Sequence, residues 1–113
     1  MNTVAVPGCP GTVVEELPSA LGRQFLRVTI ERGGEVPLHS HECAATMIVT
    51  HGSARKLVER GNAERVKAGD VITKAAREPH GFTEIGEEGF SFISVSGGLG
   101  IVQEGGKLDM ELV

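Results

Sequence analysis

The sequence predicts an all-β domain, and three observations support this fold class. The apolar stretches are rich in valine and isoleucine, which favour strands. In several stretches apolar and polar residues alternate, as in strands with one buried face. Glycine is abundant, at 16 of 113 residues, and recurs between these stretches, where tight turns are expected. A chain of 113 residues can build one core, so we expect a single domain over residues 1–113.

The first strand is predicted at residues 12–17 and the second at residues 24–31, where Leu26, Val28 and Ile30 alternate with Arg27 and Thr29. A β-branched run predicts the strand at residues 44–50, and a nearly continuous apolar run predicts the strand at residues 90–95, the last of the core. The strands after residue 31 are expected at residues 44–50, 55–60, 64–67, 71–75, 80–85 and 90–95.

Turn-forming residues separate these strands. They lie at residues 32–35, 51–52, 61–62, 68–70 and 86–89. No helix-forming segment follows the glycine-rich residues 97–100, so a bend between strands is expected there rather than a phosphate-binding loop.

We therefore place the core of the fold at about residues 12–103, between two flanking segments. Residues 1–11 form an N-terminal segment, and residues 104–113 form either a final edge strand or a mobile tail. So many short strands, with a turn every 8 to 12 residues or so, fit a β-sandwich or a closed jelly-roll barrel.

Composition excludes several functions. A net charge of −4 and a pI near 5.5 provide no basic stripe for nucleic acid. No stretch approaches the roughly 20 apolar residues that span a bilayer, and the first residues do not resemble a signal peptide, so we expect a cytoplasmic protein. Cys9 and Cys43 are expected to be reduced thiols, since nothing indicates secretion.

Three of the four histidines form a pattern typical of a metal site. His39 and His41 are two residues apart, so in an extended chain their side chains lie on the same face. His80 lies near the start of another predicted strand. A barrel can bring such distant residues together at its mouth, which favours the barrel over the sandwich.

These residues also carry a resemblance to the cupin family. The first cupin motif is G, five residues, H-x-H, three or four residues, E, six residues, G. Gly33, His39, His41, Ala45 and Gly52 match its spacing, with alanine in place of the glutamate. In the second motif the chain keeps the first glycine, at position 69, and the histidine, at position 80, but has Glu84 where the family has asparagine.

The resemblance implies a cupin-type jelly-roll β-barrel in which His39, His41 and His80 bind a divalent metal ion. Imidazole suits iron, nickel, zinc or manganese, and the sequence does not select one of them. The alternative is a barrel that has lost its metal, because the glutamate ligand is absent.

Ala45 removes a negative charge and leaves space beside the ion. Some cupin dioxygenases likewise use three histidines, so we expect a metal-dependent oxygenase acting on a small anionic or thiol substrate. An isomerase or lyase, and a noncatalytic module that binds or senses a small ligand or metal, remain alternatives, and whether the protein is an enzyme stays open.

Several residues are candidates for the surroundings of the ion. Glu84 shares a strand face with His80 and is either an additional ligand or, slightly favoured, a solvent-exposed carboxylate. Cys43, Ala45, Met47 and Phe82 have the parity of the pocket wall, although the thiol is more often a core residue.

Three further basic residues near the motifs have either two possible orientations or no expected role in the site. Lys74 interrupts an apolar strand and is either an anion contact or, more commonly for lysine, an outward side chain. His51 and Arg77 are expected at the surface. Small cupins commonly form homodimers, and open sheet edges together with the apolar residues 4–14 favour a dimer that shares a sheet.

Overall fold

The computed structural model describes residues 3–60 and 63–113, and these form an antiparallel β-structure. Its strands are β1 (Thr3–Ala5), β2 (Thr12–Glu16), β3 (Gln24–Ile30), β4 (Val36–Ser40), β5 (Ala45–Val58), β6 (Arg65–Lys67), β7 (Val71–Lys74), β8 (His80–Thr83), β9 (Phe90–Ser96) and β10 (Glu111–Leu112). A single 3-10 turn, η1 (Glu104–Gly106), precedes β10. The described residues include no helix that is long and apolar enough to cross a membrane.

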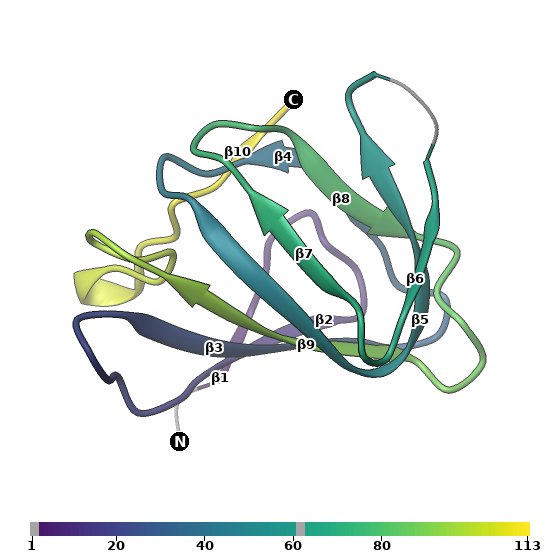
Figure 1. The fold of residues 1–113 in the computed structure, drawn as a ribbon, viewed down its shortest axis with the longest axis horizontal. Helices are drawn as coiled ribbons and strands as arrows, with labels where there is room; N and C mark the ends of the chain where they lie inside the picture. The colour runs from purple at the N-terminus through teal and green to yellow at the C-terminus, as the bar shows by residue number, and fades with distance from the viewer. Residues whose placement is uncertain (1–2, 61–62) are drawn as a thin grey trace.

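The strands form one sheet that curls around a central core (Figure 1). The order along the sheet is β1-β2-β3-β9-β5-β8-β4-β10, and β6 and β7 pair with β5 in addition. All of these pairings are antiparallel. The all-β fold class is therefore confirmed.

The longest strand differs from the prediction. Residues 44–50 and 55–60 are not two strands separated by a turn but parts of β5, which continues through His51 and Gly52. The register with β9 shifts between Val49 and His51, and Gly52 has a φ of +74°. Glycine therefore marks a bulge that bends a continuous strand, not a chain reversal.

The bend lets one strand serve both parts of the curled sheet. Before the bend β5 pairs with β7 and β9, and after it β5 pairs with β6 and β8. At Gly52 an added Cβ would lie 1.8 Å from the carbonyl oxygen of Gly89. Only a residue without a side chain allows this close approach.

Short strands near both ends of the described chain also join the sheet. β1 lies in the predicted N-terminal segment and pairs with β2. The sequence pattern did not reveal β1. Of the two alternatives for the C-terminus, the structure has the edge strand, because β10 pairs with β4. The predicted turn at residues 61–62 lies outside the described residues.

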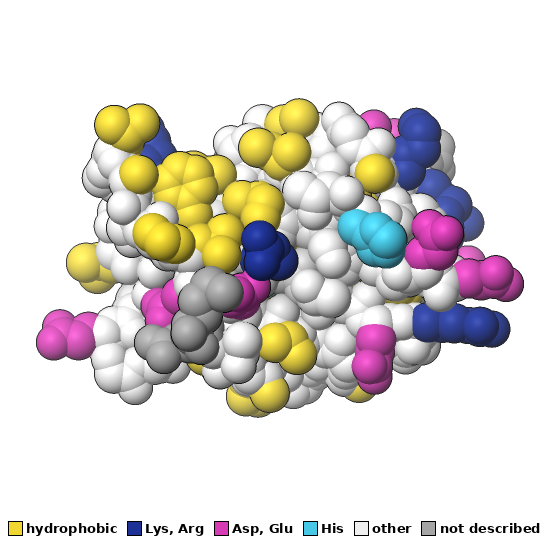
Figure 2. Space-filling model, turned by 90° about the horizontal axis from the view of Figure 1, so that it is seen from below, with side chains coloured by type: hydrophobic (Ala, Val, Ile, Leu, Met, Phe, Trp, Pro, Cys, Tyr) yellow, Lys and Arg dark blue, Asp and Glu magenta, His cyan; other side chains and the backbone are white. Residues whose placement is uncertain are grey.

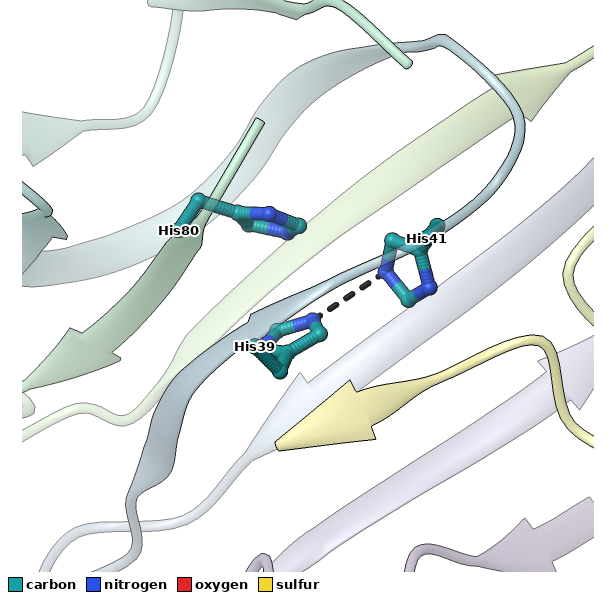
Figure 3. Close-up of side chains that lie close together, drawn as sticks. All are labelled: His39, His41 and His80. Atoms are coloured by element: carbon teal, nitrogen blue, oxygen red, sulfur yellow. Dashed lines mark hydrogen bonds between the residues drawn. The ribbon is translucent and has the colours of Figure 1, made fainter. Parts of the chain in front are cut away.

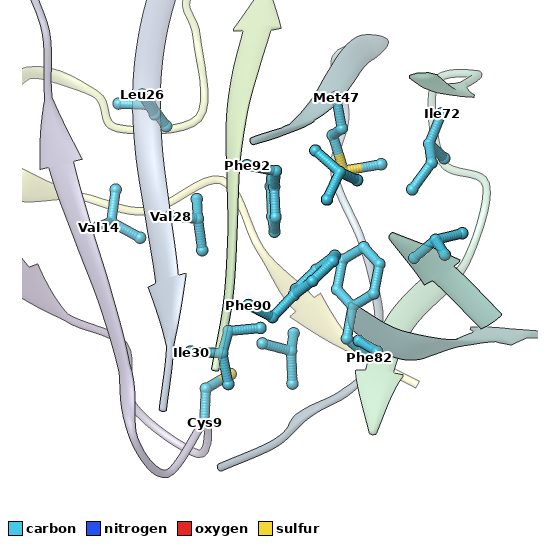
Figure 4. Packing of buried hydrophobic residues seen from close by; sticks show 14 of the residues in the cluster. Cys9, Val14, Leu26, Val28, Ile30, Met47, Ile72, Phe82, Phe90 and Phe92 are labelled. Carbon is cyan, nitrogen blue, oxygen red and sulfur yellow. The ribbon is translucent and has the colours of Figure 1, made fainter. Parts of the chain in front are cut away.

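Side chains on the inner face of the sheet form the core (Figure 4). In β3 the predicted alternation is present, with Leu26, Val28 and Ile30 buried. Phe82, Phe90 and another aromatic residue, Phe92, pack together with ring centroids 5.0 to 5.6 Å apart. This aromatic cluster packs side chains of β8 and β9 against each other inside the curled sheet.

Replacing Gly52 should be more damaging than replacing a glycine of similar φ in open space. Gly52→Ala adds a Cβ against the Gly89 backbone, and we expect a loss of about 3 kcal/mol or more in unfolding free energy. Gly33→Ala is the control, since Gly33 has a φ of +84° but nothing within 4 Å of an added Cβ. Its cost should be about 1–2 kcal/mol. Urea unfolding of both variants measures the difference, and equal losses would contradict a special role for the bend.

Candidate metal centre

Two neighbouring strands bring the three histidines together. His39 lies in β4, His41 follows the end of β4, and His80 is the first residue of β8. His39 is directly paired with His80 in the antiparallel register of β4 and β8. Because His39 and His41 are two residues apart, all three side chains extend to the same side. Figure 3 shows their rings facing one another.

A close approach between the backbones makes this pairing possible. The register of β4 and β8 shifts between Val36 and His39, so β4 is irregular there. Next to His80, Gly81 packs so tightly on β4 that an added Cβ would lie 2.5 Å from the carbonyl oxygen of Val36. Position 81 therefore requires glycine, because a side chain there would prevent β8 from lying against the bulge.

The geometry suits a single ion. One ring nitrogen from each histidine lies within 4.8 Å of the others. The Nε2 atoms of His39 and His41 are 3.1 Å apart. Two imidazoles that bind one metal at about 2.1 Å, with an angle between 90° and 110°, place their nitrogens roughly 3.0–3.4 Å apart.

Hydrogen bonds define the protonation of two of these rings. Nδ1 of His39 is 2.8 Å from the carbonyl oxygen of Pro37, and Nδ1 of His41 bonds to the carbonyl oxygen of Asp109. A carbonyl only accepts, so in both neutral rings Nδ1 carries the proton and donates it. Each Nε2 atom is then unprotonated, and its lone pair is directed at the centre of the cluster. Metal-bound histidines that are oriented by carbonyls have the same arrangement.

Burial keeps the cluster neutral. His39, His41 and His80 are 4%, 7% and 5% exposed. Removal from water lowers the pKa of His39 to about 4 and that of His80 to about 2, with smaller contributions from neighbouring charged groups, and it also lowers the pKa of His41. Nδ1 of His80 is buried and has no hydrogen-bond partner among the described residues. Protons therefore do not fill the space between these nitrogens near neutral pH, and the donor set fits a divalent metal.

The cluster lines a cavity of about 70 Å³ inside the barrel. The cavity wall is mainly apolar and includes Ala45, Met47 and Phe82, which the sequence placed there. Cys43 is not part of this wall. Burial and the Asp109 carboxylate raise the pKa of the Cys43 thiol, so it remains protonated and is poorly suited to binding a metal.

Lys74 also lines the cavity and is only 3% exposed. Of the two alternatives for this residue, the commoner outward orientation is wrong. Its Nζ donates to the carbonyl oxygens of Cys43 and Ala75, each at 3.1 Å. These contacts hold an amine inside a mainly apolar cavity.

Glu84 does not join the histidines. Its backbone has a φ of +48°, its side chain is 58% exposed, and it pairs with Arg55. β8 has ended at Thr83, so the regular alternation that would turn Glu84 inward does not extend to it. His51 is exposed, with Nε2 2.9 Å from the carbonyl oxygen of Glu88. Arg77, also exposed, lies in a turn and contacts Glu42 at 3.6 Å.

The sequence analysis missed the contribution of the C-terminal segment. The Asp109 carboxylate accepts hydrogen bonds from the backbone N–H groups of Glu42 and Cys43, at 3.0 to 3.3 Å, while its carbonyl accepts from His41. Ile101, Leu108 and Met110 form part of the cavity wall. No local motif indicates these contacts, which join residues far apart in sequence.

Gln24 attaches the same segment to β3. Its side-chain oxygen accepts from the backbone N–H groups of Ile101 and Val102, and its amide donates to the Val102 carbonyl at 2.6 Å. Gly100 is needed beside it, since an added Cβ would lie 2.7 Å from the Gln24 side chain.

Solved structures with similar folds include three of particular interest. The polyketide cyclase RemF from Streptomyces resistomycificus is 26% identical, with a TM-score of 0.74, over 82% of this chain and 69% of RemF. A cupin-2 domain protein from Rhodospirillum rubrum is 18% identical, with a TM-score of 0.78, over 99% of this chain and 74% of that protein. KdgF from a Halomonas species is 20% identical, with a TM-score of 0.70, over 85% and 87% of the two chains.

No curated protein matches the sequence. The family model described as "Cupin domain" matches residues 26–96, which include all three histidines of the cluster and most of the curled sheet. The motifs, the fold and this match agree, and the chain belongs to the cupin family.

Proposed function

We propose that His39, His41 and His80 bind one divalent first-row metal ion and that this ion is the reactive centre of a small enzyme. The contact between the Nε2 atoms of His39 and His41 carries the proposal. Two neutral acceptors 3.1 Å apart repel unless a cation lies between them. A shared proton is disfavoured by the lowered pKa values, which leaves a metal ion as the species that best fits this geometry.

The substrate that best fits this centre is a small anion or a thiol. Three neutral imidazoles leave the charge of a divalent ion uncompensated, and no carboxylate lines the cavity in the described part of the chain. When bound, the metal ion polarises a coordinated substrate oxygen or sulfur, and a redox-active ion also provides electron transfer with dioxygen. The apolar wall excludes water, and the C-terminal segment closes the cavity over the substrate.

An oxygenase is the reaction type that this site supports best, because it needs no protein carboxylate as a general base. RemF, a polyketide cyclase, favours an isomerase, lyase or cyclase as a second candidate. The cavity of about 70 Å³ is far below the roughly 300–1,000 Å³ of pockets for larger ligands, which argues against a polyketide-sized substrate in this conformation. The same small size favours a noncatalytic binding module as a third candidate.

Metal content tests the ligand set. Wild-type protein purified without a tag and loaded anaerobically with ferrous, nickel, manganese or zinc ions should bind about one ion per chain. His41→Ala and His80→Ala should each weaken metal binding by at least about 100-fold, because two histidines remain where three are needed. His51→Ala is the matched control and should retain full binding. If wild type binds no near-stoichiometric metal under any of these conditions, the assignment is wrong.

Oxygen consumption separates the three candidates. Ferrous-loaded wild type should consume dioxygen with at least one member of a panel of small carboxylic acids, diketones and thiols, whereas His80→Ala should not. Product analysis by mass spectrometry should show oxygen atoms from labelled dioxygen in the product. Substrate conversion without oxygen uptake would instead support an isomerase, lyase or cyclase, and binding without conversion would support the noncatalytic module.

We also propose that the protein forms a homodimer. Within the described residues β1 is an edge strand whose one partner is β2, and Val13 on β2 is 43% exposed. On the face shown in Figure 2, hydrophobic side chains gather in one half. Pairing of β1 with a second copy would satisfy its free backbone groups and cover apolar surface. Light scattering at micromolar concentration should give twice the mass of one chain, and a monomer under these conditions would contradict the proposal.

A further inference from the structure

Lys74 is a buried cation without a counter-ion. It is 3% exposed, and none of the described residues forms an ion pair with it. Two of its N–H groups are used by the carbonyl oxygens of Cys43 and Ala75. A lysine ammonium has three N–H groups, so one remains for another acceptor. A buried charge is costly unless it is paired, and the protein itself supplies no anionic partner here.

The nearest carboxylates are committed to other groups. Glu78 and Asp109 both act on Lys74 at longer range and raise its pKa against the larger, opposing effect of burial. The Glu78 carboxylate accepts from the backbone N–H of Ala75 at 2.9 Å. The Asp109 carboxylate accepts from the backbone N–H groups that follow His41. Neither carboxylate lies within 4 Å of the amine as an ion-pair partner.

Lys74 and the histidines line the same cavity. In the antiparallel ladder Lys74 is directly opposite Ala45, whose methyl group leaves the space beside the amine open. Ser94 also lines the cavity.

The remaining wall selects for size and polarity. It is built mainly from aliphatic and aromatic side chains, among them Val28, Met47 and Phe92. A water-sized group requires about 10–15 Å³ on this measure, so a cavity of about 70 Å³ has room for roughly five non-hydrogen atoms. A ligand with one anionic end and a short apolar tail satisfies both the amine and the wall.

We propose that Lys74 determines specificity by binding the carboxylate of a short monocarboxylic acid, which lies between the amine and the three histidines. The acid has about two or three carbons, because its two oxygens and its carbons together must fit the space for roughly five non-hydrogen atoms. The carboxylate accepts the third N–H of Lys74, and the tail packs against the apolar wall. This proposal names the substrate class of the proposed function and rests on that function for the metal ion. The contact between Lys74 and the carboxylate does not require the ion.

Calorimetric titration with propionate and with propionamide, its uncharged isostere, tests this contact. Metal content of each sample is measured first, with zinc as the loading ion. Wild type should bind propionate, and Lys74→Met should bind it about 10- to 100-fold more weakly at unchanged zinc stoichiometry, as expected for losing a charge-assisted hydrogen bond. Propionamide should bind both proteins weakly and alike. Lys67→Met is the matched control, since Lys67 is exposed on β6, and its propionate affinity should equal that of wild type.

The proposal is overturned if wild type fails to bind propionate, if Lys74→Met binds it as tightly as wild type, or if propionamide binds wild type as well as propionate does. The last comparison needs no substitution, so with metal-free wild type, in which Lys74 is the only charged side chain of the cavity wall among the described residues, it tests the contact even where Lys74→Met fails to fold. Failure of the metal assignment is distinguishable, because it appears as absent zinc in wild type. In that case the same titrations of metal-free protein still report on Lys74, with the same outcomes for and against it.

Discussion

The fold depends on the contact between Gly52 and the backbone of Gly89. This contact lets a 14-residue strand bend without breaking, so that β5 pairs with β7 and β9 on one side of the bend and with β6 and β8 on the other. A straight strand would leave a flat sheet with two exposed faces. With the bend, one face turns inward and encloses both the aromatic cluster and the histidines.

Enclosure determines the electrostatics of the centre. Three imidazoles that would titrate near neutral pH in water are held neutral by burial, and two of them are fixed in the tautomer that directs Nε2 inward. The only charged side chain in the cavity wall is Lys74, within the described residues. The interior thus combines neutral imidazoles, one cation and apolar walls. This arrangement lacks negative charge and is complementary to an anion.

Much of this arrangement follows from local sequence rules. The two-residue period of a strand places His39 beside His41, and the motif spacing brings in His80. The rules fail where tertiary contacts override local preference. A glycine after a strand usually marks a turn, but Gly52 makes a bulge because Gly89 packs on it. A lone lysine in a strand usually faces solvent, but two backbone carbonyls hold Lys74 inside.

Other parts of the site have no local signal at all. A positive φ turns Glu84 outward, and strand parity cannot reveal where a strand stops. Asp109 is 68 residues from His41, and only the folded chain shows their hydrogen bond.

That hydrogen bond connects the C-terminal segment of the cavity wall to one histidine of the cluster. Residues 101–113 lie entirely outside the matched family region, and they supply both cavity-lining side chains and the acceptor for His41. Because Asp109 supplies this acceptor, the position of the segment and the orientation of the His41 ring depend on each other. Sequence changes in this segment are therefore expected to alter the cavity wall and the orientation of His41 together.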